Sequence, residues 1–200
     1  MDKLRIGILG LGRGITHLKN FLALPEAEVI GACDRFPLLR ERAKDQIAAA
    51  DASTPVLKEF DELLALRPDA IMIASNGKLQ VEHACQALNA GCHVLSEVPG
   101  AYTQQECMRL RETVEYTGKT YMLAENTCYW DFFRYFRQWV STNRFGPISI
   151  AEGEYIHHLP ATLMRPDGTR LSPTSARAAG HRDATPIWRA DQPPIQYLTH

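Results

Sequence analysis

The sequence has no long apolar run and no block of basic residues. No stretch of its 200 residues approaches the roughly 20 apolar residues of a membrane-spanning helix, and the N-terminus lacks the apolar segment of a signal peptide. Lys and Arg together number 22 against 23 Asp and Glu, which gives no electrostatic reason to expect nucleic acid or an anionic membrane as partner. We therefore expect a cytoplasmic protein whose partner is a small molecule.

Paired cysteines are absent as well. The chain has five cysteines, an odd number, and no Cys-x-x-Cys pair. This pattern suggests neither a disulfide framework nor a zinc site. We expect reduced and mostly buried thiols, and no metal site.

What the sequence does have is a regular alternation of apolar runs with segments of helical period, which is typical of a parallel sheet with crossover helices. Thr103 with Glu106 forms a capping box, and Gly91 and Gly118 stand where a helix end needs a left-handed residue. Residues 1–125 are therefore predicted to form a doubly wound α/β domain, with strands at 4–9, 28–33, 56–57, 69–74, 92–96 and 120–124.

From residue 126 the character changes. An amphipathic helix carrying Phe132, Phe136 and Val140 on one face leads into a strand-like run at 148–157. We interpret 126–200 as the beginning of a second α/β (α+β) domain, incomplete in this chain. Within it, 160–196 holds six prolines and no steady period, which predicts an irregular segment.

A glycine-rich turn follows the first strand and precedes a helix, an arrangement that lets a backbone approach a pyrophosphate. Asp34 lies 22 residues after Gly12, where a carboxylate accepts hydrogen bonds from the adenosine ribose and repels a 2′-phosphate. This favours NAD over NADP, although Arg35 could stack on adenine or tolerate that phosphate. The alternative is a flavodoxin-like sheet with a structural glycine turn. The candidate cofactor residues here are Gly10, Gly12, Arg13, Gly14, Ile15 (where a third glycine is usual), Asp34 and Arg35.

Several further motifs accompany this turn. They are Arg5-Ile-Gly-Ile-Leu-Gly-Leu-Gly12, Cys33-Asp34-Arg35, Asp69-Ala-Ile-Met-Ile-Ala74, Ala90-Gly-Cys-His-Val-Leu-Ser-Glu-Val-Pro99, Ala124-Glu-Asn126 and Gly146-Pro-Ile148. With them, the chain from Leu4 to Tyr155 resembles the glucose-fructose oxidoreductase / inositol dehydrogenase (Gfo/Idh/MocA) family. The resemblance implies a Rossmann domain followed by a domain with a large open sheet, a sugar, polyol or related substrate, and a full-length form that is a homo-oligomer.

Two departures from the family pattern bear on chemistry. Most members carry Glu-Lys-Pro at Glu97-Val98-Pro99, and that lysine helps to polarise the substrate hydroxyl. Valine cannot, so another acid-base group is needed. Relatives also usually read Thr-Pro-Asn-x-x-His at Ser75-Asn76-Gly-Lys-Leu-Gln80. Asn76 and Gln80 can still hydrogen-bond a cofactor or substrate, but Gln80 cannot carry a proton.

The Glu-Val-Pro form resembles a subgroup that includes NAD-dependent glycosidases similar to α-N-acetylgalactosaminidase. It shares Glu125-Asn126-Thr-Cys128-Tyr129, Glu152-Gly-Glu-Tyr155-Ile-His157, Trp188-Arg189 and Tyr197-Leu-Thr-His200. The resemblance implies further cofactor contacts from Ser75, Asn76, Gln80, Glu97, Val98 and Asn126. It implies substrate contacts from Tyr129, Tyr155, Arg189, Tyr197 and His200, and catalytic roles for Tyr155, His157 and His200.

Structural roles compete with some of these assignments. Tyr155 and Trp188 can be core aromatics, Asn126 can be a helix cap, and His17, His83 and His93 are interpreted as structural. We expect an NAD(P)-dependent oxidoreductase acting by hydride transfer. The alternatives are an NAD-dependent glycosidase that oxidises its substrate transiently, and a non-catalytic NAD-binding module, because the chain resembles a C-terminally truncated family member.

Overall fold

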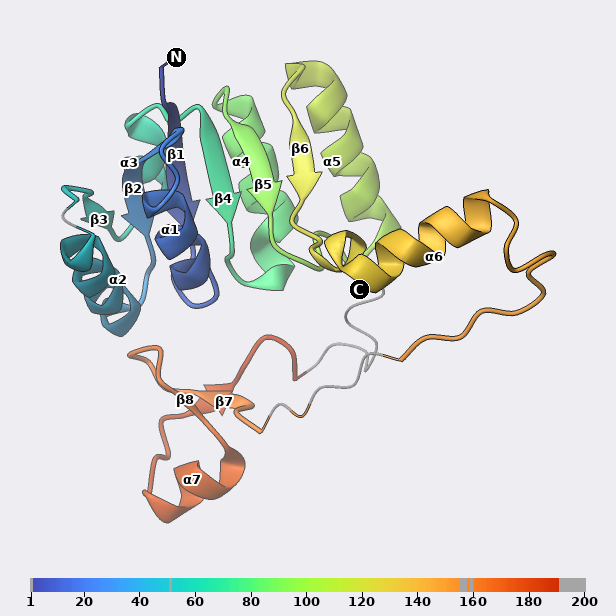
Figure 1. Cartoon of the computed structure of the whole chain (residues 1–200). Helices are drawn as coiled ribbons and strands as arrows, with labels where there is room; N and C mark the ends of the chain where they lie inside the picture. The colour runs from blue at the N-terminus through green and yellow to red at the C-terminus, as the bar shows by residue number, and fades with distance from the viewer. Residues whose placement is uncertain (1, 51, 155–157, 159, 191–200) are drawn as a thin grey trace.

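The computed structural model describes residues 2–50, 52–154, 158 and 160–190. Its dominant feature is a parallel sheet with the strand order β3-β2-β1-β4-β5-β6 (Figure 1). The doubly wound α/β fold predicted from the sequence is confirmed. The strands are β1 (Leu4–Leu9), β2 (Ala27–Cys33), β3 (Val56–Leu57), β4 (Ala70–Ile73), β5 (His93–Ser96) and β6 (Tyr121–Leu123).

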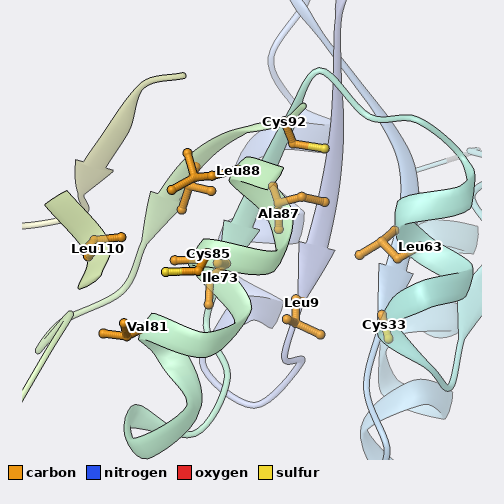
Figure 2. Close-up of a cluster of buried hydrophobic side chains, with 13 residues drawn as sticks. Leu9, Cys33, Leu63, Ile73, Val81, Cys85, Ala87, Leu88, Cys92 and Leu110 are labelled. Carbon is orange, nitrogen blue, oxygen red and sulfur yellow. The ribbon is translucent and has the colours of Figure 1, made fainter. Parts of the chain in front are cut away.

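Five helices cover the two faces of this sheet. Helices α1 (Gly14–Leu22) and α2 (Pro37–Ala49) lie on one face, and α3 (Phe60–Ala65), α4 (Gln80–Asn89) and α5 (Gln104–Thr117) lie on the other (Figure 1). Successive strand residues point to opposite faces. Ile8 therefore joins the cluster under α1 and α2, and Leu9 joins the cluster under α3, α4 and α5 that Figure 2 shows.

The predicted helix ends are present. Thr103 accepts a hydrogen bond from the Glu106 N–H, and the Glu106 carboxylate accepts one from the Thr103 N–H, which completes the capping box of α5. Gly118 ends α5 with a φ of +65°, and Gly91 follows α4 with a φ of +87°. Both values lie where only glycine fits without strain.

The chain after β6 departs from the prediction. A short 3-10 helix, η2 (Thr127–Tyr129), leads into α6 (Asp131–Ser141). Helix α6 carries the predicted aromatic face, but none of the residues of α6 is buried in the described structure. The strand predicted at 148–157 is wrong over its described part, because 148–154 form no strand there. A strand needs a partner for its backbone groups, and alternating side chains alone do not supply one.

Residues 160–190 are more regular than predicted. They contain β7 (Leu163–Met164), β8 (Arg170–Leu171), α7 (Pro173–Ala178) and β9 (Thr185–Pro186), with the three strands antiparallel in the order β8-β7-β9. The segment expected to be irregular at 160–196 thus contains these short regular elements within 160–190, and 191–196 lie outside the described residues. Among the described helices, none has both the length and the apolar character required to cross a bilayer.

Candidate functional site

The glycine turn after β1 packs against the end of β4. Gly10 has a φ of +89°, and a Cβ there would lie 2.5 Å from the Ala74 carbonyl oxygen. A Cβ on Gly14 would lie 3.2 Å from the Ala74 Cβ. Gly12 is exposed, and a Cβ on it would meet only Leu39, at 4.0 Å. The turn is thus fixed at Gly10 and Gly14 and leaves an open surface at Gly12.

Asp34 faces this turn from the end of β2. Its side chain is buried, and Oδ2 accepts a hydrogen bond from the Leu11 N–H at 2.7 Å, while Oδ1 accepts one from the Phe36 N–H at 2.8 Å. Arg40 donates to the carbonyl oxygens of Asp34 and Arg35 and so holds this turn from α2. Each carboxylate oxygen retains a second lone pair that can accept a hydroxyl hydrogen bond.

These residues fit a dinucleotide. The open backbone at Gly12 leaves room for a diphosphate beside the start of α1, whose first turn contains no acidic residue. The carboxylate of Asp34 lies next to that turn, as a ribose acceptor requires. Arg35 stacks over the Phe36 ring, with its guanidinium carbon 4.7 Å from the ring centroid. Ile15, at the usual third glycine position, packs against the apolar cluster under α1.

Glu97, directly after β5, joins the loop after this strand to the start of α1. Its Oε1 accepts hydrogen bonds from His17 Nε2 at 2.7 Å and Arg13 Nε at 3.2 Å, and its Oε2 accepts one from the Val98 N–H. Burial alone would raise the pKa of Glu97, but the hydrogen bonds and charges of His17 and Arg13 outweigh burial and lower that pKa. The carboxylate is therefore ionised and can only accept, so His17 Nε2 carries the hydrogen.

His17 was interpreted from the sequence as structural, and its contact with Glu97 was not anticipated. The two residues lie 80 positions apart in the chain. A local signal exists, because His17 follows the buried Gly14 by one helical turn and so lies on the side of α1 that meets the strand ends.

The loops after β4 and β5 are joined by Gln80. Its Oε1 accepts a hydrogen bond from the Gly100 N–H at 3.0 Å, and its Nε2 lies 3.5 Å from the Val98 carbonyl oxygen, beside the cis Val98–Pro99 peptide bond. Ser75 Oγ pairs with His83 Nδ1 at 2.8 Å, and Asn76 Oδ1 accepts from the Lys78 N–H at 3.0 Å. Direct cofactor contacts from Ser75, Asn76, Gln80 and Val98 stay predictions.

The remaining predicted residues are spread more widely. Asn126 is exposed and precedes η2 as its N-cap residue, without a side-chain capping bond. Tyr129, on η2, is 66% exposed. Arg189 is partly buried, with its guanidinium carbon 4.8 Å from the Trp188 ring centroid. The candidates Tyr155, His157, Tyr197 and His200 lie outside the described residues.

Trp188, in the segment 162–190, contacts the loops after β4 and β5. Its ring lies 2.8 Å from the position of a Cβ on Gly77, after β4, and its centroid is 6.1 Å from that of Tyr102, in the loop after β5. Burial raises the pKa of Tyr102 to about 12, so its hydroxyl is neutral near pH 7. From the sequence, Trp188 is part of the Trp188-Arg189 pair of the resembled subgroup or a core aromatic, and no local pattern predicts its contacts with Gly77 and Tyr102.

A sequence model described as the oxidoreductase family with an NAD-binding Rossmann fold, Gfo/Idh/MocA, matches residues 4–125. The chain belongs to this family. Its cofactor is accordingly NAD, which the geometry around Gly12 and Asp34 accommodates.

Relatives and solved structures agree with this membership. The chain is 28% identical over 170 residues to Glycosyl hydrolase family 109 protein 2 of Akkermansia muciniphila, covering 82% of this chain and 36% of the relative. It is 32% identical over 167 residues to Glycosyl hydrolase family 109 protein 1 of Phocaeicola vulgatus, covering 80% and 35%. The scyllo-inositol dehydrogenase of Lactobacillus casei, solved with NAD(H) and scyllo-inositol, superimposes with a TM-score of 0.66 at 26% identity, covering 72% and 43%. The chain thus spans about a third of the length of these glycosyl hydrolase relatives.

Proposed function

We propose that this protein is an NAD-dependent oxidoreductase that acts on a sugar, polyol or related substrate. The observation that carries the proposal is the buried carboxylate of Asp34, held beside the glycine turn by the Leu11 N–H. NAD, when bound, supplies a hydride acceptor. The solved scyllo-inositol dehydrogenase, which binds NAD(H) and a polyol, supports the substrate class.

Each part of the site has a proposed task. The turn at Gly12 receives the diphosphate, and Asp34 receives the adenosine ribose hydroxyls. Glu97, held ionised by His17 and Arg13, borders the nicotinamide side. Because Val98 has no proton to exchange, we assign acid-base chemistry to Tyr155, His157 and His200, and substrate contacts to Tyr129, Tyr155, Arg189, Tyr197 and His200.

A glycosidase that oxidises and then reduces its substrate is the second candidate. The relatives named as Glycosyl hydrolase family 109 proteins favour it, as does the Glu-Val-Pro turn itself. In this case NAD is recycled, so no NADH accumulates while the glycosidic bond is broken.

One pair of assays on the purified natural protein separates the candidates. Free polyols and hexoses with NAD test the dehydrogenase, read as NADH absorbance, and aryl glycosides with NAD test the glycosidase, read as released phenol. NADH formation without phenol release supports the oxidoreductase, and phenol release without net NADH supports the glycosidase. Binding of NADH with neither product would leave the non-catalytic module.

The domain division is also proposed. Residues 1–125 form the cofactor domain, which coincides with the family match at 4–125, and 126–200 begin a second domain of the whole protein. All five cysteines are free, three of them buried. Free thiols support placing the protein in the reducing cytoplasm.

A further inference from the structure

The turn between β7 and β8 packs against the loop that carries Asp34. Gly168, at the tip of this turn, is buried and has a φ of +96°. A Cβ on Gly168 would lie 2.9 Å from the Phe36 Cβ and 3.0 Å from the Phe36 Cγ. The backbone of the turn therefore rests directly on Phe36, at a distance that only glycine allows.

The segment 162–190 contacts the sheet on both sides of β1, the strand that precedes the glycine turn. Phe36 follows β2, and the Trp188 contact lies after β4 and β5, so the two contacts of the segment 162–190 fall on opposite sides of β1. Figure 1 shows β7 and β8 beyond the arrowheads of the parallel sheet, at the edge where its carboxyl ends gather. Ligands of open α/β sheets bind at this edge.

The β7–β8 turn has backbone hydrogen bonds of its own, and Arg165 adds two ion pairs. The Arg165 N–H donates to the Thr169 carbonyl oxygen and the Gly168 N–H donates to the Arg165 carbonyl oxygen, each at 2.9 Å. The Arg165 side chain pairs with Asp167 at 3.3 Å and with Asp183 at 3.4 Å. The hydrogen bonds fix the backbone of the turn, and the ion pair with Asp183 ties the turn to the chain before β9.

A short chain of contacts links Gly168 to the cofactor residues. Gly168 meets Phe36, and the Phe36 N–H donates to Asp34 Oδ1 at 2.8 Å, while Oδ2 of the same carboxylate accepts from Leu11. Displacing Phe36 would therefore disturb Asp34 and the glycine turn together. Arg35, stacked on the Phe36 ring, would move as well.

We propose that the β7–β8 turn is a clamp on the adenosine end of the dinucleotide site, in which Gly168 holds Phe36 and thereby positions Asp34. This inference rests on the proposed NAD-binding function. Gly168 is a positioning residue. The clamp gives a role to the contact of this distant segment with the loop after β2. It also makes binding of the adenosine end of the cofactor depend on the folded structure of 162–190.

Matched variants test the clamp, with AMP and NADH as probes. AMP contains only the adenosine end with one phosphate, so a defect at the clamp weakens AMP and NADH alike. Gly180→Ala is the control for Gly168→Ala, because Gly180 also has a positive φ, +66°, but a Cβ there meets nothing within 4 Å. We expect Gly168→Ala to raise both dissociation constants about fivefold or more, and Gly180→Ala to leave them within about twofold.

A double-mutant cycle tests the path through Phe36. In a Phe36→Gly background the Cβ of Gly168→Ala has no side chain to meet, so its effect on AMP affinity should fall to within about twofold. The same loss in both backgrounds would show that Gly168 acts by another route and would overturn the clamp.

Hydrogen exchange on the unaltered chain gives a measurement that does not depend on whether the variants fold. AMP should slow exchange at 34–40 and also at 163–171, while the α7 segment 173–178 stays unchanged. Protection at 34–40 alone would overturn the clamp and leave the cofactor site intact. Failure of the parent chain to bind either AMP or NADH would instead overturn the proposed function and the clamp with it.

Discussion

The Asp34 carboxylate accepts a hydrogen bond from the Leu11 backbone N–H at 2.7 Å, which ties the end of β2 to the glycine turn after β1. The same carboxylate accepts from Phe36 at 2.8 Å. One buried acidic side chain thus holds the glycine turn in place. In the proposed site, the same carboxylate offers its remaining lone pairs to the adenosine ribose.

Asp34→Asn should lower the stability of the fold and weaken NADH binding. An amide has one acceptor oxygen, so one of the two N–H groups is left facing a donor, which costs about 1–3 kcal/mol in the free energy of unfolding. We also expect the NADH dissociation constant to rise about tenfold or more. Urea denaturation and fluorescence titration measure the two effects. Asp45→Asn, on the exposed face of α2, is the control, and equal effects from both variants would refute the role of Asp34.

Two glycines with nearly the same φ allow the cost of a steric clash to be separated from the cost of a positive φ. Gly10 has a φ of +89° and Gly91 a φ of +87°, but only at Gly10 would a Cβ strike backbone, 2.5 Å from the Ala74 carbonyl oxygen. Gly91→Ala should lower the free energy of unfolding only by the cost of a positive φ in alanine, about 1–2 kcal/mol. Gly10→Ala should cost at least about 2 kcal/mol more, since overpacking adds to strain. Similar losses in chemical denaturation would argue against the close approach to β4.

Gln80 is expected to stabilise the Glu-Val-Pro turn through the Gly100 N–H. Gln80→Leu leaves this buried donor without its acceptor and should lower the free energy of unfolding by about 1–3 kcal/mol. Gln86→Leu removes an exposed hydrogen bond to Asp61 and should cost less than about 1 kcal/mol. A larger loss of stability from Gln86→Leu than from Gln80→Leu would contradict this expectation.

Glu97 should make the stability of the fold decrease as the pH is lowered into the acidic range. Its carboxyl has a pKa below the ordinary 4.5, because the hydrogen bonds and charges of His17 and Arg13 outweigh burial. A lowered pKa in the folded state gives stability that is complete above the ordinary value and is lost as the pH falls through the folded-state value. Glu97→Gln should therefore lose less stability than the parent between about pH 5 and about pH 3. Denaturation at both pH values checks this, with the exposed Glu112→Gln expected to behave like the parent.

The sequence could predict what local signals determine. Apolar runs of strand length located β1 to β6, and Thr103 with Glu106 marked the start of α5. Gly12 and Asp34 lie 22 residues apart, each after one of the first two predicted strands, and this local arrangement predicted the cofactor turn. The alternation at 148–154 also suggested a strand, but forming one requires a neighbouring strand that no local pattern provides.

The contacts between distant segments could not be predicted in the same way. His17 meets Glu97 and Gly168 meets Phe36 only because the fold brings separate loops to one edge of the sheet. The prolines at 160–190 were interpreted as a sign of irregular chain. Pro173 instead begins α7 after the Ser172 cap, and Pro186 lies in β9, an edge strand where its missing N–H costs nothing.

The central claim is that the loops after β1 and β2 form an NAD site built around Asp34. The most direct test is a fluorescence titration of this 200-residue chain with NADH and with NADPH. We predict saturable binding of NADH, at least about tenfold tighter than that of NADPH, because the Asp34 carboxylate repels a 2′-phosphate. Absence of saturable NADH binding by the folded chain, or NADPH binding as tightly as NADH, would contradict the account.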